Sequence, residues 1–238
     1  MTKALYMADC YIKEFEAVVE NVSDSKYVLL DQTAFFPKGG GVAWDTGKLV
    51  RIADGVEFPV IYTGKFSGNI SHEVQNPVGN GLKKGDEVKG ILDWERRYML
   101  MRYHTAAHIV SGVFHNEGKM KITGNELDAE KGRIDFNMDD FDREQILKFI
   151  GRSNEIVRKD LPVKIYSVPR EQADPILFKL AMGFPHDVQE VRVVDIVGFD
   201  RQADGGCHVK STKEVGTIAF QKAENKGKNN RRVYFTIS

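Results

Sequence analysis

The sequence predicts an α+β protein, in which a small N-terminal β-barrel-like domain precedes a domain of helices packed on an antiparallel sheet. Two observations support this fold class. Short alternating segments separated by turn residues fill the chain up to about residue 94, with no long helical period between them. Helical patterns begin only after that point and then mix with further short strands. We therefore place the domains at residues 1–94 and 95–238.

The first domain is built from short strands. Residues 15–19 and 27–30 are apolar segments on either side of the polar cluster 21–25, which is suited to a hairpin turn. Strands of this length and spacing are typical of a small barrel or sandwich. Three further segments continue the pattern: residues 47–52, 58–62 and 87–94.

The second domain mixes helices with strands. Its opening helix runs to about Asn116, and a second helix uses Asp139 or Asp140 as its N-cap and ends before Pro162. A third helix is expected over residues 169–182, opened by its proline. The strands predicted between and after these helices cover residues 121–124, 133–136, 163–168, 191–196, 197–199, 217–220 and 232–237.

Composition limits the class of protein. With 238 residues, 42% of them hydrophobic, the chain can bury a core, and its 34 basic and 34 acidic residues cancel. That balance disfavours a protein that coats nucleic acid non-specifically. Cys10 and Cys207 are too few for a disulfide framework. No apolar run is long enough to span a bilayer or to form a signal peptide, so we expect a cytoplasmic protein without a membrane partner.

Histidines mark the candidate site. His104 and His108 stand four residues apart on the opening helix of the second domain, and residues at that spacing share one helix face. Such a pair can close on one metal ion, although it also occurs by accident on amphipathic helices.

A second cluster lies about a hundred residues later. Asp204, Cys207 and His208 surround two glycines that let the backbone bend close to a bound group; a tight turn with a buried cysteine is the alternative. Together with His104 and His108, these side chains form a nitrogen-rich set suited to zinc, and half of the six histidines are used.

The fourth ligand decides what such a site can do. A closed shell of three histidines with Cys207 or Asp204 would be structural, whereas an open shell would leave one position for a water that the metal polarises. The residue after His104 is Thr105 and not the glutamate that serves metalloproteases as a base. An ester is therefore a better substrate than a peptide.

Two further stretches suit ligand binding. Gly39, Gly40 and Gly41 form either a wide turn or a loop whose backbone amides approach a ligand; the pattern lacks the Lys-Ser or Lys-Thr of a phosphate loop. The C-terminal region carries a basic run without an acid after Glu224, which is either a solvated tail or a contact to phosphate. Its members are Lys222, Lys226, Lys228, Arg231 and Arg232.

Several motifs in matching order resemble the AlaX family, free-standing relatives of the editing domain of alanyl-tRNA synthetase. The likeness covers nearly the whole chain, from the glycine loop to the basic end, and is closest to the medium-length form, which keeps an N-terminal β domain. The motifs are Phe36 to Gly41, His104-Thr105-Ala106-Ala107-His108, Arg133-Ile134-Asp135-Phe136, Asp204 to Val209 and Thr212 to Gly216.

The resemblance implies an ATP-independent, zinc-dependent aminoacyl-tRNA deacylase that hydrolyses, in trans, tRNA(Ala) mischarged with serine and perhaps glycine. It assigns zinc to His104, His108, Asp204 and His208. Asp204 stands where the family usually has cysteine, so Asp204, Cys207 and water all remain open as fourth ligand. No obligate protein partner is evident.

The resemblance also implies roles outside the metal ligands. Thr123 is the candidate for a hydrogen bond to the serine hydroxyl, unless it merely fills a strand position. Gly39 to Gly41 would face the substrate, and tRNA phosphates would meet Lys226, Lys228, Arg231 and Arg232. A zinc-stabilised RNA-binding module without catalysis and a metal-dependent hydrolase of small esters or amides are the alternatives.

Overall fold

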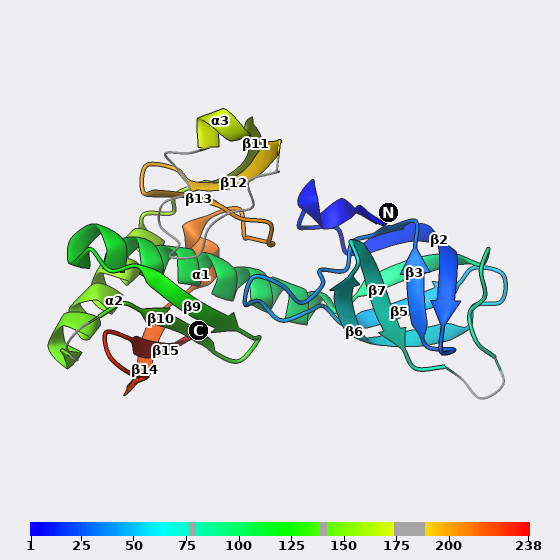
Figure 1. The fold of residues 1–238 in the computed structure, drawn as a ribbon, viewed down its shortest axis with the longest axis horizontal. Coiled ribbons are helices and arrows are strands. Elements are labelled where there is room, and N and C mark those ends of the chain that lie inside the picture. The colour runs from blue at the N-terminus through cyan, green and yellow to red at the C-terminus, as the bar shows by residue number, and fades with distance from the viewer. Residues whose placement is uncertain (77–79, 139–141, 174–188) are drawn as a thin grey trace. The chain divides into compact units, whose positions relative to one another are not determined.

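The computed structural model confirms the α+β fold (Figure 1). It describes residues 1–76, 80–138, 142–173 and 189–238. The chain divides into two compact units, Met1–Leu100 and Met101–Ser238. Among the described residues, no helix has the length and apolar character needed to cross a membrane.

The first unit is a closed six-stranded barrel with the strand order β2-β3-β7-β6-β5-β8. A parallel pair of short strands, β1 (Lys3–Ala4) and β4 (Gln32–Thr33), and a 3-10 turn, η1 (Leu5–Met7), accompany it. The barrel strands are β2 (Glu14–Ser23), β3 (Tyr27–Leu30), β5 (Gly47–Arg51), β6 (Glu57–Phe66), β7 (Asn69–Val74) and β8 (Glu87–Leu92).

Strand β7 is the barrel strand that the alternation of apolar residues does not reveal. Its central residues Ser71 and His72 are polar and yet buried. The His72 ring is satisfied by Thr33 Oγ1 at 2.9 Å and by the carbonyl of Val28 at 3.0 Å, and burial lowers the pKa of His72 to about 4. Long-range hydrogen bonds thus make a polar segment into a core strand.

A buried ion pair anchors the start of the next helix to the barrel. Arg97 and Asp45 are each 1% exposed, and the Arg97 Nε lies 2.9 Å from Asp45 Oδ2. Arg97 also donates to the carbonyls of Cys10 and Ala34, while Asp45 Oδ2 accepts from the Phe36 amide at 2.6 Å. Since Phe36 and Asp45 flank the glycine loop, this pair holds both ends of that loop together.

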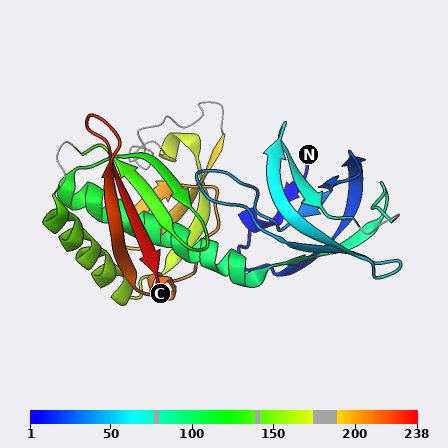
Figure 2. The same cartoon turned by 90° about the horizontal axis from the view of Figure 1, so that it is seen from below.

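The second unit contains two antiparallel sheets and, between them, the part of α1 (Trp94–Gly118) that follows Leu100 (Figures 1 and 2). One sheet has the order β14-β15-β10-β9 and the other β11-β12-β13. The elements that follow α1 are β9 (Ile122–Leu127), β10 (Gly132–Phe136), α2 (Arg143–Arg158), β11 (Val163–Pro169), α3 (Arg170–Ala173), β12 (Glu190–Ile196), β13 (Asp200–Ala203), η3 (Thr212–Val215), β14 (Ile218–Asn225) and β15 (Arg231–Ile237).

Three details of the sequence prediction change. The N-cap of α2 is Asp142, whose side chain accepts from the Gln145 amide at 3.1 Å; Asp139 and Asp140 lie outside the described residues. Residues 197–199 form a turn and not a strand, because the chain reverses there into β13. The helix expected at 169–182 does not open at its proline, because Pro169 still pairs with Glu190 at the end of β11 and α3 begins at Arg170. Residues 174–182 lie outside the described part.

Candidate metal centre

Helix α1 carries His104 and His108 into the interior of the second unit. Every residue from 103 to 114 is buried, because this stretch of the helix is covered on both sides by sheets. The two imidazole centroids are 5.1 Å apart. Buried imidazoles need polar partners, since an unpaired buried polar group is costly.

The polar partner of both imidazoles, Asp204, lies in the loop after β13. A strand beside this loop holds it in place. In β12, the buried Arg192 donates through Nη1 to the carbonyls of Asp204 and Gly206, at 2.8 and 2.9 Å. Two hydrogen bonds to backbone atoms on either side of Gly205 fix the course of the loop. Sequence reasoning missed Arg192, although a charged residue within the apolar run 191–194 was a usable signal.

Gly206 allows the loop to pass close to the histidine helix. A Cβ atom at this position would lie 2.4 Å from His104 Cε1 and 2.6 Å from His104 Nδ1. The same atom at Gly205 would meet nothing within 4 Å. The two adjacent glycines therefore differ in the space around them. Position 205 has room for a larger side chain, and position 206 does not.

Three imidazoles and one carboxylate converge at this point. Asp204 Oδ2 lies 3.3 Å from His104 Nε2 and 3.7 Å from His108 Nε2, and Asp204 Oδ1 lies 3.3 Å from His208 Nε2. One ligand atom from each of the four residues lies within 4.8 Å of the others. Four ligands about 2.0–2.1 Å from a tetrahedral zinc ion lie about 3.3–3.4 Å apart, so these residues fit a zinc ion.

Thr105 orients the third histidine. Its buried hydroxyl lies 3.1 Å from His208 Nδ1 and accepts from the Val209 amide at 3.3 Å. If His208 offers the lone pair of Nε2 to a metal, its proton resides on Nδ1 and is donated to Thr105. The residue that replaces the metalloprotease glutamate thus has a different task here.

The charges of the group also suit a cation. Burial acts to raise the pKa of Asp204, but the three imidazoles, His104 foremost, outweigh it and hold that pKa well below its usual value. Burial, together with the charges of His104 and His108, holds the pKa of His208 well below its usual value. An ionised carboxylate and a neutral imidazole are the forms that bind a divalent ion.

If the group holds a metal ion, we expect Thr105→Val to weaken its binding by about 10- to 100-fold, the usual cost of removing a partner of a ligating histidine. Valine keeps the shape of the side chain but cannot accept the His208 Nδ1 proton. Competition with a chromophoric chelator measures the affinity. Thr105→Ser retains the hydroxyl and should restore most of it, and equal affinities of wild type and Thr105→Val would refute the assigned role.

The chain matches two models of tRNA synthetase domains. Residues 2–96 match the family described as tRNA synthetases class II (A), and residues 191–234 match the Threonyl and Alanyl tRNA synthetase second additional domain. The alanyl-tRNA editing protein AlaX-M of Methanosarcina acetivorans is 49% identical over 243 residues, which cover 100% of this chain and 99% of the relative.

This chain belongs to the AlaX family of alanyl-tRNA editing proteins. AlaX-M of Saccharolobus solfataricus is 42% identical, again over 100% of this chain. The alanine-tRNA ligase of Thermofilum pendens is 38% identical over 94% of this chain but over only 25% of its own length. The resemblance inferred from the motifs is therefore confirmed.

Two residues that the sequence brought forward, Cys207 by its place in the second cluster and Thr123 by the resemblance, do not belong to the convergent group. Cys207 is buried, but its sulfur does not belong to the four-ligand cluster. Thr123 is exposed on β9, and its hydroxyl donates to Asn230 Oδ1 at 3.1 Å. A contact between Thr123 and a serine substrate stays a prediction.

The glycine loop of this AlaX protein is an exposed turn of the first unit. Gly39 and Val42 exchange backbone hydrogen bonds of 3.2 and 2.9 Å. Gly40 and Gly41 have φ angles of 59° and 80°, a region that favours glycine. The turn itself therefore requires glycine at two positions, and the predicted contact with substrate stays a prediction.

The two arginines of the basic run have structural partners. Arg231 is buried, and its Nη1 donates to Asn225 Oδ1 and to the carbonyl of Gly227, which fixes the turn between β14 and β15. Arg232 forms a two-pronged pair with Asp135 of β10, at 2.7 and 2.8 Å. Both guanidinium groups thus hold the sheet together.

The two lysines of the run are more accessible. Lys226 is exposed and pairs with Glu224 at 2.9 Å. Lys228 is exposed, and no ion pair of its side chain is seen within residues 1–76, 80–138, 142–173 and 189–238. Of the four cations predicted to meet tRNA, these two are available on the surface.

Proposed function

We propose that this AlaX protein is a zinc-dependent deacylase that hydrolyses, in trans, the ester of seryl-tRNA(Ala), with glycyl-tRNA(Ala) as a second substrate. One observation carries the proposal: four ligand atoms from two distant segments converge in one buried group of an alanyl-tRNA editing protein. A zinc-stabilised RNA-binding module would use the same four ligands, so the family membership and not the cluster alone favours a deacylase.

Zinc is the metal that the donor set favours. Imidazole nitrogens with a carboxylate oxygen are ordinary zinc ligands, and Asp204 rather than Cys207 offers the fourth atom. When bound, zinc supplies a Lewis acid that polarises a carbonyl oxygen or lowers the pKa of a water.

Asp204 is the ligand nearest to solvent. Its side chain is 22% exposed, whereas those of His104, His108 and His208 are 5%, 8% and 0% exposed. A substrate group that approaches the cluster from solvent therefore meets the carboxylate first. Of the four ligands, Asp204 is therefore the one that a water or a substrate oxygen can reach, and its displacement would open the position that a catalytic zinc site needs.

The selectivity of synthetases explains why such a deacylase is needed. A pocket shaped for alanine cannot strongly reject glycine or the small additional hydroxyl of serine. A separate hydrolytic site that hydrogen-bonds this hydroxyl can remove serine and leave alanine attached. Because tRNA is charged and used in the cytoplasm, we place the reaction there.

Release of amino acid from tRNA(Ala) charged separately with serine, glycine and alanine tests the proposal. We expect the zinc-loaded protein to release serine rapidly, glycine next and alanine at the uncatalysed rate. Chelator treatment should abolish the release, while circular dichroism shows that the fold persists. If the folded, zinc-loaded protein releases none of the three, the non-catalytic binding module becomes the better account.

Charge reversal separates a tRNA substrate from a small ester. Lys226→Glu with Lys228→Glu should lower deacylation of seryl-tRNA without changing hydrolysis of a small amino acid ester. The defect should be largest at low salt and shrink as the salt concentration rises, because the variant has fewer salt-sensitive phosphate contacts to lose. Arg231 and Arg232 are left intact because they hold the sheet. Lys148→Glu with Lys164→Glu, two exposed sites elsewhere in the unit, is the control of equal charge.

A further inference from the structure

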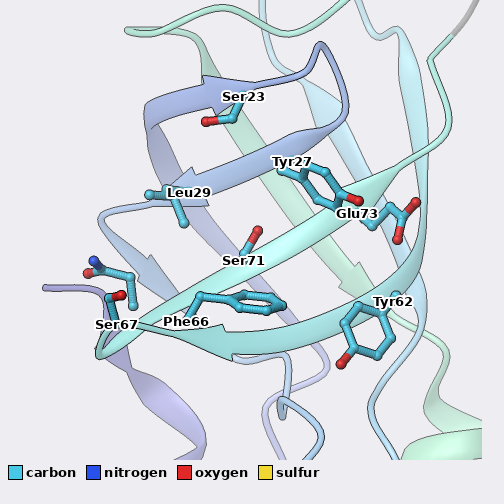
Figure 3. A pocket seen from close by; sticks show the side chains of 9 residues that line it. Ser23, Tyr27, Leu29, Tyr62, Phe66, Ser67, Ser71 and Glu73 are labelled. Carbon is cyan, nitrogen blue, oxygen red and sulfur yellow. The ribbon is translucent and has the colours of Figure 1, made fainter.

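Aromatic side chains gather on the outer face of the barrel. Tyr27 of β3 and Tyr62 and Phe66 of β6 line a groove of ≈ 510 Å³ on the face of strands β2, β3, β7 and β6 (Figure 3). Phe66 is 58% exposed, and with its neighbouring rings it forms an apolar patch rather than a single exposed residue. We call these three residues, together with Trp44, the aromatic strip.

A glycine keeps two rings of the strip close together. A Cβ atom on Gly64 would lie 2.7 Å from Tyr62 Cε1 and 2.9 Å from Phe66 Cε2. Across the groove floor, Ser71 of β7 pairs in register with Gly64. Small residues therefore form the floor and rings form the walls, a shape that accepts a flat apolar group.

The strip continues into the glycine loop. The Tyr62 ring packs edge to face against Trp44, with centroids 4.7 Å apart, and the Trp44 indole donates to the carbonyl of Ile61 at 2.9 Å. Trp44 follows the glycine loop directly, three residues after Gly41. One line of rings thus connects the groove on the barrel with the loop.

Cations stand along the strip. Lys38 Nζ and Arg96 Cζ lie 5.6 and 5.9 Å from the centre of the Trp44 ring. At the other end, Lys26 Nζ lies 4.7 Å from the centre of the Tyr27 ring and pairs with Glu73 at 2.7 Å. Positive charges thus lie at both ends of the aromatic strip, and the one at the Tyr27 end is paired with Glu73.

We propose that the aromatic strip binds unpaired nucleotides of RNA. Bases stack on exposed aromatic rings, phosphates bind cations such as Lys38 and Arg96 at the end of the strip, and small barrels bind single strands in this way. Glu73 and Ser71 in the groove offer acceptors to base amino groups. The inference rests on the proposed function in one respect, since a protein that edits tRNA meets the unpaired 3′ end of its substrate.

Binding of a fluorescein-labelled six-nucleotide single-stranded RNA to the full chain, followed by fluorescence anisotropy, tests the strip. We expect Phe66→Ala to weaken binding about 5- to 150-fold, which corresponds to the stacking of one base. Lys38→Glu should weaken it as well and reduce its dependence on salt. An RNA duplex of the same sequence should bind the wild type more weakly than the single strand.

Ile52→Ala is the matched control, because Ile52 is 49% exposed on the same unit and does not line the groove. Its affinity should equal that of the wild type. Equal affinity of Phe66→Ala and wild type, or no binding of the single strand, overturns the proposal. A dimer in solution that Phe66→Lys dissociates would instead assign the strip to a second copy. Binding is measured without an ester, so loss of deacylation and loss of RNA binding are distinguishable.

Discussion

Replacing Gly206 by alanine should abolish the proposed zinc binding and deacylation, although it adds a single methyl group. The new Cβ would lie 2.4 Å from His104 Cε1 and 3.0 Å from Asp204 Oδ1, so it displaces two of the four proposed ligands at once. The loop cannot retreat easily, because Arg192 holds the carbonyls of Asp204 and Gly206. We therefore expect a loss of zinc affinity larger than the about 10- to 100-fold cost of removing an outer partner of a ligand.

Gly205→Ala provides the control for this prediction. The two glycines are neighbours in one loop, but a Cβ at 205 meets nothing within 4 Å and the residue is exposed. Zinc content by mass spectrometry and affinity by chelator competition should match the wild type for Gly205→Ala and collapse for Gly206→Ala. Normal zinc affinity in Gly206→Ala would show that His104 and Asp204 are not both ligands.

The sequence identifies the parts of this site that depend on local spacing. His104 and His108 share a helix face at a spacing of four residues, and that relation holds wherever the helix forms. The choice between Asp204 and Cys207 depends on how the loop after β13 turns. The hydrogen bonds from Arg192 decide that course, and they join segments that spacing cannot relate.

Long-range pairing also limits what a basic run reveals. In the sequence, Lys228 and Arg232 are two similar members of one basic run. In the structure, however, Arg232 donates hydrogen bonds to the carboxylate of Asp135, a residue 97 positions away in the chain. The same reason hides strand β7, whose His72 becomes a core residue through Thr33 and Val28. By contrast, β2, β3 and β6 alternate clearly because one face of each packs on the barrel core.

Arg97→Met should destabilise the barrel by about 3–5 kcal/mol, the usual cost of leaving a buried charge without its partner. The Asp45 carboxylate would keep the Phe36 amide but lose the guanidinium, and the carbonyls of Cys10 and Ala34 would lose donors. Both tryptophans, Trp44 and Trp94, lie in this unit. Urea unfolding followed by tryptophan fluorescence therefore reports the barrel.

Two comparisons show whether the buried charge is the cause. Lys48→Met breaks the exposed pair with Glu57, whose side chains are 39% and 55% exposed, and should cost at most about 1 kcal/mol. Adding Asp45→Asn to Arg97→Met removes the uncompensated charge, so the double variant should be more stable than Arg97→Met alone. If the double variant is less stable instead, packing and not charge accounts for the role of Arg97.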